Sequence, residues 1–257
     1  MSRAASNYLP DFPAIEDRLR HGRSVKDGYT RGWGLQFGRL RDDVRGDPVY
    51  QRAVKLTRGR SVVSEDNRLN LFLLCRFYLA RLAPGHIVEF GAYRGGNALF
   101  LAAVAAELFP GIKVYALDTF AGIPDADAAI DAHSAGDFGD VDLDELATFA
   151  ARHSLDNIEF VKGRFEDTAT PLLNRIGRVA LAHIDSDTFS SVAYAYDVVR
   201  NSMVPGGYLV FDDATVSSCL GATEAVETLL IQRDGLNSEQ IWPHYVFRAP
   251  SAQDDTR

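Results

Sequence analysis

Short apolar blocks alternate with amphipathic stretches along this chain from about residue 65 onward. The blocks have the length of buried strands, and the stretches between them carry apolar residues at helical spacing. Strands are expected at residues 87–90, 113–117, 158–162, 179–184 and 207–211. Helices are expected at about 65–82, 96–108, 142–153, 168–175, 188–202 and 219–232, with a candidate last strand at 241–248. Strands joined by helices of this length predict an α/β fold, with a mostly parallel sheet and helices on both faces.

The N-terminal quarter follows a different pattern. Residues 14–60 predict short helical pieces that are interrupted at Gly28, Gly32, Gly34 and Pro48. Ser64 is a suitable N-cap for the stronger helix that follows. We therefore divide the chain into an N-terminal helical appendage or lid, residues 1–64, and a main domain, residues 65–257.

Charge is distributed unevenly between these two parts. The first 60 residues contain 13 Lys and Arg against 7 Asp and Glu, whereas the whole chain has a net charge of −8. An acidic body lacks the phosphate-tracking surface that nucleic-acid binding needs, so we expect no nucleic-acid partner. Because Trp33, Leu35, Phe37 and Leu40 are interleaved with the basic residues, we expect this segment to pack on the acidic body. Packing on a second subunit, in a homodimer or larger homo-oligomer, fits the pattern equally well, and a small nucleic-acid arm is the less favoured alternative.

Composition narrows the class of protein further. At 257 residues, with 46% hydrophobic and 24% charged residues, the chain has the material for one sizeable core. No apolar run approaches the ~20 residues that a transmembrane helix needs, and no signal-peptide pattern begins the chain. Cys75 and Cys219 form neither a CxxC motif nor a disulfide framework, and Cys75 lies in an apolar helical pattern typical of a core thiol. We expect a cytoplasmic protein with no membrane partner.

A glycine-rich loop follows the first predicted strand. Residues 89–97 read EFGAYRGGN, in which Gly91 permits a tight turn and the later glycine pair lets a ligand approach the next helix. This is not a GxGxxG loop, and the carboxylate of Glu89 would repel a diphosphate but suits a ligand with an ammonium group. Asp118 ends the second strand, 22 residues after the last glycine, where nucleotide-binding folds place a ribose-binding carboxylate. Together these residues favour a nucleoside site over an ordinary strand–helix turn.

The residues after the third strand line the base pocket in this architecture. Here they are Gly163, Arg164 and Phe165, which are candidates to flank or stack on an adenine ring. For Phe165, an ordinary place in the core fits the sequence equally well.

Aspartates follow the fourth and fifth strands. The fourth runs into the sequence HIDSD, with Asp185 and Asp187, and the fifth ends at Asp212 and Asp213. Carboxylates that converge at one sheet edge repel each other unless a cation neutralises them, and oxygen ligands suit Mg²⁺, Mn²⁺ or Ca²⁺ rather than zinc. We assign Asp185, Asp212 and Asp213 to such a metal and Asp187 to proton acceptance; helix capping would explain only one of the four. His183 shares a sheet face with Asp185 and is either a core histidine or a second general base.

These motifs resemble those of the macrocin O-methyltransferase family, which tailors antibiotic sugars. The shared segments, in the family's order between about residues 65 and 215, are EFGAYRGG from Glu89, DTFAGIP from Asp118, FVKGRFEDT from Phe160, HIDSD from His183 and the pair Asp212-Asp213. Two positions depart from the family pattern: Tyr93 stands where Trp is frequent, and Phe189 stands where Tyr is usual. Neither position is a presumed ligand, so the departures bear on the substrate rather than on the chemistry.

The resemblance implies a Rossmann-like class I methyltransferase with S-adenosylmethionine as methyl donor and Mg²⁺ (or Mn²⁺ or Ca²⁺) as metal. It implies that the substrate is a small-molecule glycoside or polyol, in particular a deoxysugar of a glycosylated natural product. The residues that it assigns to the cofactor site are Glu89, Gly91, Tyr93, Arg94, Gly95, Gly96, Asn97, Asp118, Thr119, Phe120, Gly163, Arg164, Phe165 and Asp185. We hypothesise that the metal chelates two vicinal hydroxyls and lowers the pKa of one of them, while Asp187 takes its proton.

Three other functions remain open at this point. A catechol is an alternative acceptor, because catechol methyltransferases combine this fold with a metal. A nicotinamide-dependent oxidoreductase would share the parallel sheet, but Glu89 disfavours a diphosphate and the Asp212-Asp213 pair would have no role. A non-catalytic nucleoside-binding subunit would not need the metal aspartates, yet all of them are present.

Overall fold

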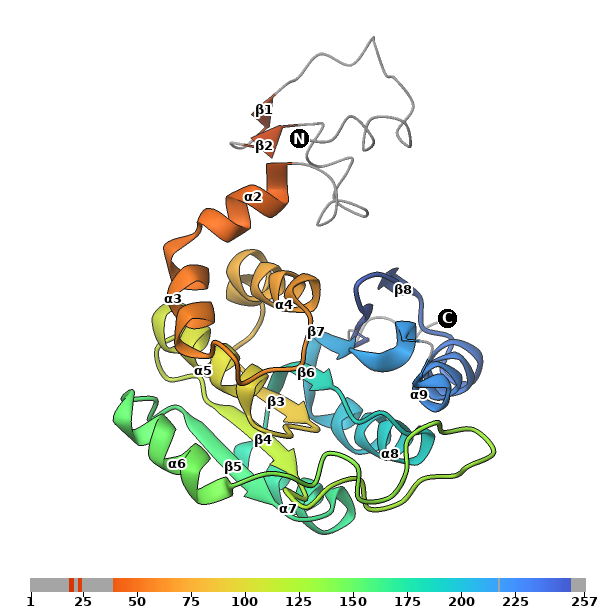
Figure 1. Ribbon diagram of the computed structural model, residues 1–257. Helices are drawn as coiled ribbons and strands as arrows, with labels where there is room; N and C mark the ends of the chain where they lie inside the picture. The colour runs from red at the N-terminus through yellow and green to blue at the C-terminus, as the bar shows by residue number, and fades with distance from the viewer. Residues whose placement is uncertain (1–18, 21–22, 25–38, 217, 251–257) are drawn as a thin grey trace, which may run out of the picture.

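A single sheet of seven strands forms the centre of the part of the chain that the structure describes (Figure 1). This structure is a computed structural model and describes residues 19–20, 23–24, 39–216 and 218–250. In spatial order the strands are β5 (Ile158–Lys162), β4 (Val114–Asp118), β3 (His86–Phe90), β6 (Val179–Ile184), β7 (Met203–Phe211), β9 (Tyr245–Arg248) and β8 (Ser238–Gln240). Strands β3 to β7 run parallel, whereas β9 is antiparallel to β7 and β8 to β9. The predicted α/β fold with a mostly parallel sheet is confirmed.

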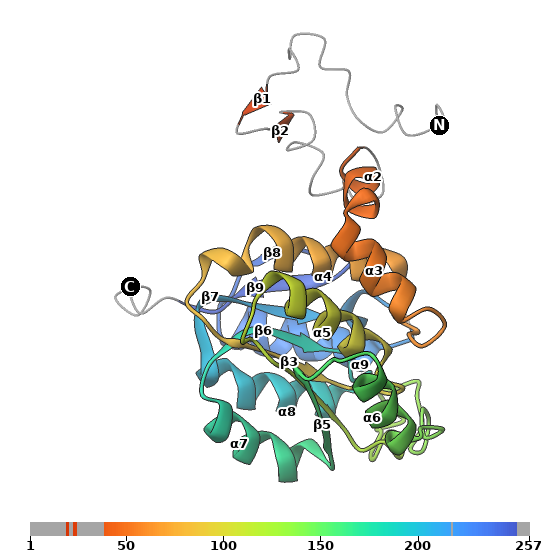
Figure 2. The same ribbon diagram turned by 90° about the vertical axis from the view of Figure 1, so that its left-hand side faces the viewer.

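Helices cover both faces of this sheet, and each layer has its own apolar core. One layer contains α3 (Pro48–Leu56), α4 (Glu65–Phe77), α5 (Gly96–Leu108) and α6 (Leu143–Arg152). The other contains α7 (Phe165–Ile176), α8 (Phe189–Val199), α9 (Leu220–Ala225) and the π-helical turn η5 (Val226–Arg233). In Figure 2 the sheet lies between α4 and α5 above and α7 and α8 below. Short 3₁₀ turns lie between some of these elements: η2 (Leu79–Arg81), η3 (Arg200–Ser202) and η4 (Asp213–Thr215).

The basic segment before residue 60 packs on the acidic body where the structure describes it. Helices α2 (Arg39–Gly46) and α3 lie over α4 and α5 (Figure 1). Arg41 and Arg45 pair with acids at the start of α4, and Arg52 and Arg60 pair with Glu107 of α5 and Glu145 of α6. Docking on the body, one of the two arrangements expected from the charge pattern, is therefore confirmed for residues 39–60. Trp33, Leu35 and Phe37 lie outside the described residues.

Several predicted boundaries differ from the structure. The prediction of short helical pieces within residues 14–60 is wrong at residues 19–20 and 23–24. Here β1 (Leu19–Arg20) and β2 (Arg23–Ser24) form an antiparallel pair that is too short to produce a periodic pattern. The helix expected at 168–175 already begins at Phe165, and the strand expected at 207–211 begins at Met203. The last strand begins at Tyr245 rather than 241, and Pro243 has no N–H for a ladder. No helix among the described residues has the length and apolar character needed to cross a membrane.

Candidate active site

A cavity of about 520 Å³ lies where the parallel strands end. Residues directly after β3, β6 and β7 and the last residue of β4 line it, as expected for ligand sites in parallel sheets. The remaining walls come from the segment before α4 and the first turn of that helix, the loop between β4 and α6, the first turns of α7 and α8, the end of η4, and the turn before β9. The lining residues used below are Asn67, Gly91, Tyr93, Asp118, Thr119, Phe165, Asp185, Asp187, Asp212 and Asp213.

Asp118 holds two loops in place at one side of the cavity. Its Oδ2 accepts the backbone N–H of Tyr93 at 2.8 Å, and its Oδ1 accepts that of Phe120 at 2.7 Å. Both residues have a positive backbone φ, 46° for Tyr93 and 49° for Phe120, which residues other than glycine rarely adopt. The carboxylate therefore stabilises both turns. A carboxylate accepts about four hydrogen bonds, so it retains capacity for a ligand hydroxyl.

Gly91 allows the tips of β3 and β6 to meet. Its φ is +90°, and a Cβ built on it would lie 1.6 Å from the backbone oxygen of Asp185. The backbone N–H of Asp185 in turn donates to the oxygen of Phe90 at 2.9 Å. This close approach places Asp185 next to the glycine loop.

The cofactor residues predicted from the sequence divide into two groups. The residues Gly91, Tyr93, Asp118, Thr119, Phe165 and Asp185 line the cavity. The residues Glu89, Arg94, Gly95, Gly96, Asn97, Phe120, Gly163 and Arg164 do not line it. Arg94 pairs with Asp140 and Arg164 with Asp125, whereas a Cβ on Gly96 would lie 2.4 Å from the backbone of Arg60.

Three aspartates converge at the ends of β6 and β7. One carboxylate oxygen from each of Asp185, Asp212 and Asp213 lies within 4.8 Å of the other two. Burial, followed by the charges of Asp212 and Asp213, raises the pKa of Asp185 well above its usual range. Burial and the charge of Asp212 raise the pKa of Asp213 to about 6. The cluster therefore holds more negative charge than its protein surroundings balance, and an all-oxygen donor set of this kind fits a hard divalent cation.

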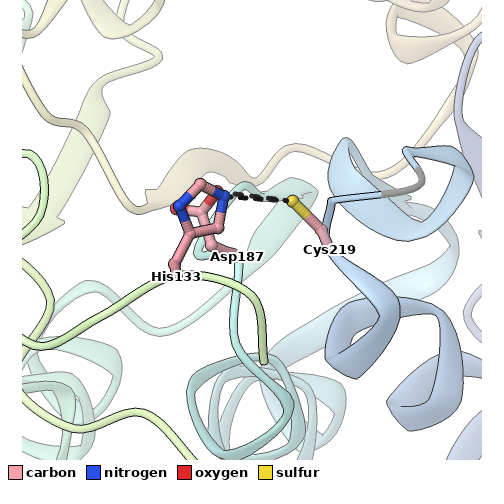
Figure 3. A group of neighbouring side chains, drawn as sticks. All are labelled: His133, Asp187 and Cys219. Atoms are coloured by element: carbon pink, nitrogen blue, oxygen red, sulfur yellow. Dashed lines mark hydrogen bonds and ion pairs between the residues drawn. The ribbon is translucent and has the colours of Figure 1, made fainter. Parts of the chain in front are cut away.

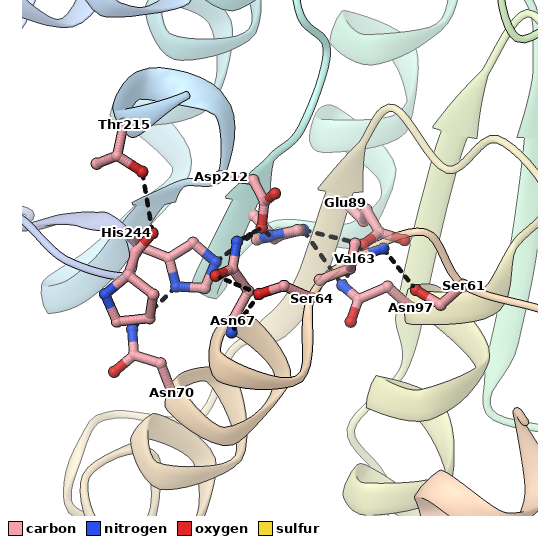
Figure 4. A network of polar contacts seen from close by, with 12 residues as sticks. Ser61, Val63, Ser64, Asn67, Asn70, Glu89, Asn97, Asp212, Thr215 and His244 are labelled. Atoms are coloured by element: carbon pink, nitrogen blue, oxygen red, sulfur yellow. Dashed lines mark hydrogen bonds and ion pairs between the residues drawn. The ribbon is translucent and has the colours of Figure 1, made fainter. Parts of the chain in front are cut away.

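Asp212 differs from its neighbours because buried donors surround it (Figure 4). Its Oδ1 lies 2.8 Å from Asn67 Nδ2, 2.8 Å from His244 Nε2 and 3.3 Å from His183 Nε2. Although it is buried, hydrogen bonds from His183 and His244 hold the pKa of Asp212 well below its usual range. These contacts use Oδ1 and leave Oδ2 for a further ligand.

His183 connects Asp212 to Glu89 through the interior. It is fully buried, and its Nδ1 lies 2.9 Å from Glu89 Oε1, which also accepts Asn97 Nδ2 at 2.6 Å. Burial alone would lower the pKa of His183, but its hydrogen bonds to Asp212 and Glu89 raise it to about 9. The histidine does not line the cavity, so the structure places it as an interior partner of Asp212 and Glu89.

Asp187 lies at the cavity wall beyond the three converging aspartates. Its φ is 62°, and its backbone N–H donates to Asp213 Oδ2 at 2.9 Å. Burial and the charge of Asp213 raise the pKa of Asp187 to about 7. Its Oδ1 also lies 3.5 Å from His133 Nε2 and 3.6 Å from Cys219 Sγ.

Sequence reasoning missed Asn67, His244 and His133 as site residues, and it noted Cys219 without assigning it a role. Asn67 and His244 lie 145 and 32 residues from Asp212, respectively, and His133 lies in a polar loop without a motif. A signal was present only for Asn67, which, like Asn70, is a polar residue among the buried, mostly apolar positions of α4.

The fold and cavity together define a class I methyltransferase, in which a nucleoside cofactor binds at the ends of parallel strands. The chain belongs to the macrocin-O-methyltransferase (TylF) family, whose model matches residues 66–233. It is therefore an S-adenosylmethionine-dependent O-methyltransferase, and the family resemblance found in the sequence motifs is confirmed.

Individual relatives are distant. The chain is 28% identical over 203 residues to the 8-demethyl-8-(2,3-dimethoxy-alpha-L-rhamnosyl)-tetracenomycin-C 4'-O-methyltransferase of Streptomyces olivaceus. This match covers 73% of this chain and 76% of the relative. It is 25% identical over 171 residues to the mycinamicin III 3''-O-methyltransferase of Micromonospora griseorubida. That match covers 62% of this chain and 65% of the relative. The crystal structure of the calicheamicin methyltransferase CalS11 superposes with a TM-score of 0.59 at 19% identity, covering 82% of this chain and 96% of that one.

Proposed function

We propose that this enzyme methylates a hydroxyl of a sugar on a glycosylated natural product, and that a divalent metal held by Asp185, Asp212 and Asp213 assists the reaction. The observation that carries the metal proposal is the convergence of these three carboxylates within 4.8 Å at the cavity. The sugar acceptor is supported by the two curated relatives, whose names specify a rhamnosyl-bearing tetracenomycin C methylated at the 4' position and mycinamicin III methylated at the 3'' position.

The chain's own residues have separate tasks in this proposal. Asp118, with Gly91, Tyr93 and Thr119 beside it, forms the wall that would hold the ribose of S-adenosylmethionine, and Phe165 lies where its base would pack. When bound, S-adenosylmethionine supplies the methyl group, and a divalent metal supplies Lewis acidity that lowers the pKa of a hydroxyl. Asp185, Asp212 and Asp213 are the metal ligands, and Asn67, His183 and His244 orient Asp212 through its Oδ1.

Asp187 is the proposed general base. Its carboxylate lines the same cavity, two residues beyond Asp185, where it can accept the proton of the reacting hydroxyl. The hydrogen bond from its backbone N–H to Asp213 keeps it beside the ligand cluster. A fixed position of the acceptor between base and methyl donor contributes to the rate, since near-attack geometry is worth ~7–11 kcal/mol.

A direct test uses labelled S-adenosylmethionine with a panel of deoxysugar glycosides and simple catechols. We expect label in a glycoside, loss of the reaction in excess chelator, and its return with Mg²⁺. Methylation that is unchanged in chelator after exhaustive dialysis would remove the metal from the proposal. If the label appeared in catechols and in no glycoside, the proposed acceptor would be a catechol instead of a sugar.

A further inference from the structure

Three side chains of different chemistry meet beside the proposed active site (Figure 3). His133 comes from the loop between β4 and α6, Asp187 follows β6, and Cys219 precedes α9. One atom from each lies close to both others: His133 Nε2 is 3.5 Å from Asp187 Oδ1 and 3.6 Å from Cys219 Sγ, which is 3.6 Å from the same oxygen. Neither His133 nor Cys219 has a role in the proposed methyl transfer.

The distance from His133 Nε2 to Asp187 Oδ1 is longer than a direct polar bond of this kind, whereas the two distances to Cys219 Sγ lie within the range of hydrogen bonds to sulfur. A charge-assisted N–H···O bond has its atoms about 2.7–2.9 Å apart, whereas His133 and Asp187 are 3.5 Å apart. All three distances also match the edges of a tetrahedron around one ion. Zinc bonds of about 2.05 Å to nitrogen, 2.1 Å to oxygen and 2.3 Å to sulfur, at tetrahedral angles, give edges of about 3.4 Å (N–O), 3.6 Å (N–S) and 3.6 Å (O–S).

The donor set also selects a metal different from that of the neighbouring aspartates. A thiolate, an imidazole and a carboxylate suit Zn²⁺ and similar soft ions, whereas Asp185, Asp212 and Asp213 offer only hard oxygen ligands. The carboxylate and the thiolate together carry the two negative charges that balance a dication. Access is available, since the side chains of His133 and Asp187 are 23% and 18% exposed.

We propose that His133, Asp187 and Cys219 form a second metal site, selective for Zn²⁺ over Mg²⁺, whose occupation inhibits methyl transfer. Zinc binding displaces the thiol proton of Cys219 to solvent and forms Zn–S, Zn–N and Zn–O bonds, with a fourth position left for water. The existence of the site stands on its own geometry. The inhibition rests on the proposed function, because the ion would engage the carboxylate that Asp187 needs for proton acceptance.

The site itself is tested with Co²⁺ as a spectroscopic substitute for zinc, in the presence of excess Mg²⁺. We expect the intense near-ultraviolet thiolate-to-cobalt absorption in the wild-type protein and in Cys75→Ala, and its loss in Cys219→Ala. Cys75 is the matched control because it is the other cysteine and lies fully buried in α4. Wild-type protein without this absorption, or with an absorption that survives Cys219→Ala, would overturn the site.

The inhibition is tested by zinc titration of methyl transfer at saturating Mg²⁺, with each variant compared with its own zinc-free rate. We expect the zinc concentration for half inhibition to rise at least about tenfold in Cys219→Ala and in His133→Gln, and to stay unchanged in Cys75→Ala. Equal zinc sensitivity in all variants would mean that zinc acts elsewhere and would refute inhibition through this site. Because the cobalt spectrum requires no substrate, failure of the proposed function leaves the test of the metal site intact.

Discussion

His244 Nε2 lies 2.8 Å from Asp212 Oδ1, and His244 is fully buried. Asn70 Nδ2 lies 2.9 Å from the other ring nitrogen of His244, so a neutral ring accepts from Asn70 at Nδ1 and donates to Asp212 from Nε2. Burial is the first cause that lowers the pKa of His244, which favours this neutral form. The pair therefore connects β7 to the turn before β9 and fixes the rotation of the Asp212 carboxylate.

Replacement of His244 by Ala is expected to weaken metal binding rather than cofactor binding. Loss of a partner that orients a metal ligand typically costs 10–100-fold in metal affinity. The Mg²⁺ concentration for half-maximal rate is the measurement, with S-adenosylmethionine affinity measured in parallel. His244→Gln, which retains a donor, is expected to recover part of the loss, and exposed His153→Ala serves as control. An unchanged Mg²⁺ requirement in His244→Ala would show that His244 does not position Asp212.

Gly91→Ala is expected to destabilise the protein much more than Gly111→Ala. Both glycines have φ near +90°, so both substitutions carry the same backbone strain of about 1–2 kcal/mol. Only at Gly91 does the new Cβ collide, 1.6 Å from the carbonyl oxygen of Asp185, whereas nothing lies within 4 Å at Gly111. Overpacking adds typically ~1–3 kcal/mol, which is the expected difference between the two variants in denaturant unfolding. Equal losses would mean that the contact between the tips of β3 and β6 relaxes without cost.

The sequence predicted the fold because its strands and glycine loops carry local signals. Asp118, Asp185 and Asp212 were found at one sheet edge because parallel strands joined by right-handed crossovers all end on the same side. The chemistry of their residue types then predicted the cluster of carboxylates. Local pattern and strand order were sufficient for these positions.

The partners of those aspartates left no such signal. His244 lies in a segment that was expected to form a strand but forms a turn, and its contact with Asp212 depends on the antiparallel pairing of β9 with β7. Glu89 reads as a ligand contact in the sequence, but in the structure its carboxylate is buried against His183. Side-chain direction at a strand tip depends on these long-range contacts, so a one-dimensional pattern does not determine it.

Asp234 is expected to make the stability of the protein depend on acid pH. Hydrogen bonds from Arg233 first, and from Tyr196, lower the pKa of Asp234 to about 2, despite a contribution from burial that raises it. A carboxyl whose pKa is lower in the folded state stabilises the fold above its unfolded pKa of about 3.9, and this stabilisation is lost as pH falls towards 2. Since the site is near the surface, solvent screening reduces the contribution to about 1 kcal/mol.

The measurement is denaturant unfolding of the wild-type protein and Asp234→Asn at pH 6, 4 and 3. We expect the wild-type advantage to be full at pH 6, to shrink at pH 4 and 3, and to decrease in high salt. A difference in unfolding free energy that is the same at all three pH values would assign the effect of Asp234→Asn to lost packing or hydrogen bonding instead of charge.

Asp187→Asn is expected to lower kcat by roughly 10²–10⁴-fold, the usual contribution of a general base, while S-adenosylmethionine still binds. Asn tolerates the positive φ of 62° at this position, and the backbone N–H that donates to Asp213 is retained, so the fold is expected to persist. Cofactor affinity by calorimetry and single-turnover rates at saturating Mg²⁺ separate binding from chemistry. The control is Asp144→Asn, an exposed acid in the first turn of α6 that is not part of the cavity wall. A single-turnover rate within a few-fold of the wild-type rate would remove Asp187 as the base and leave positioning, with the aspartate cluster, as the source of the acceleration.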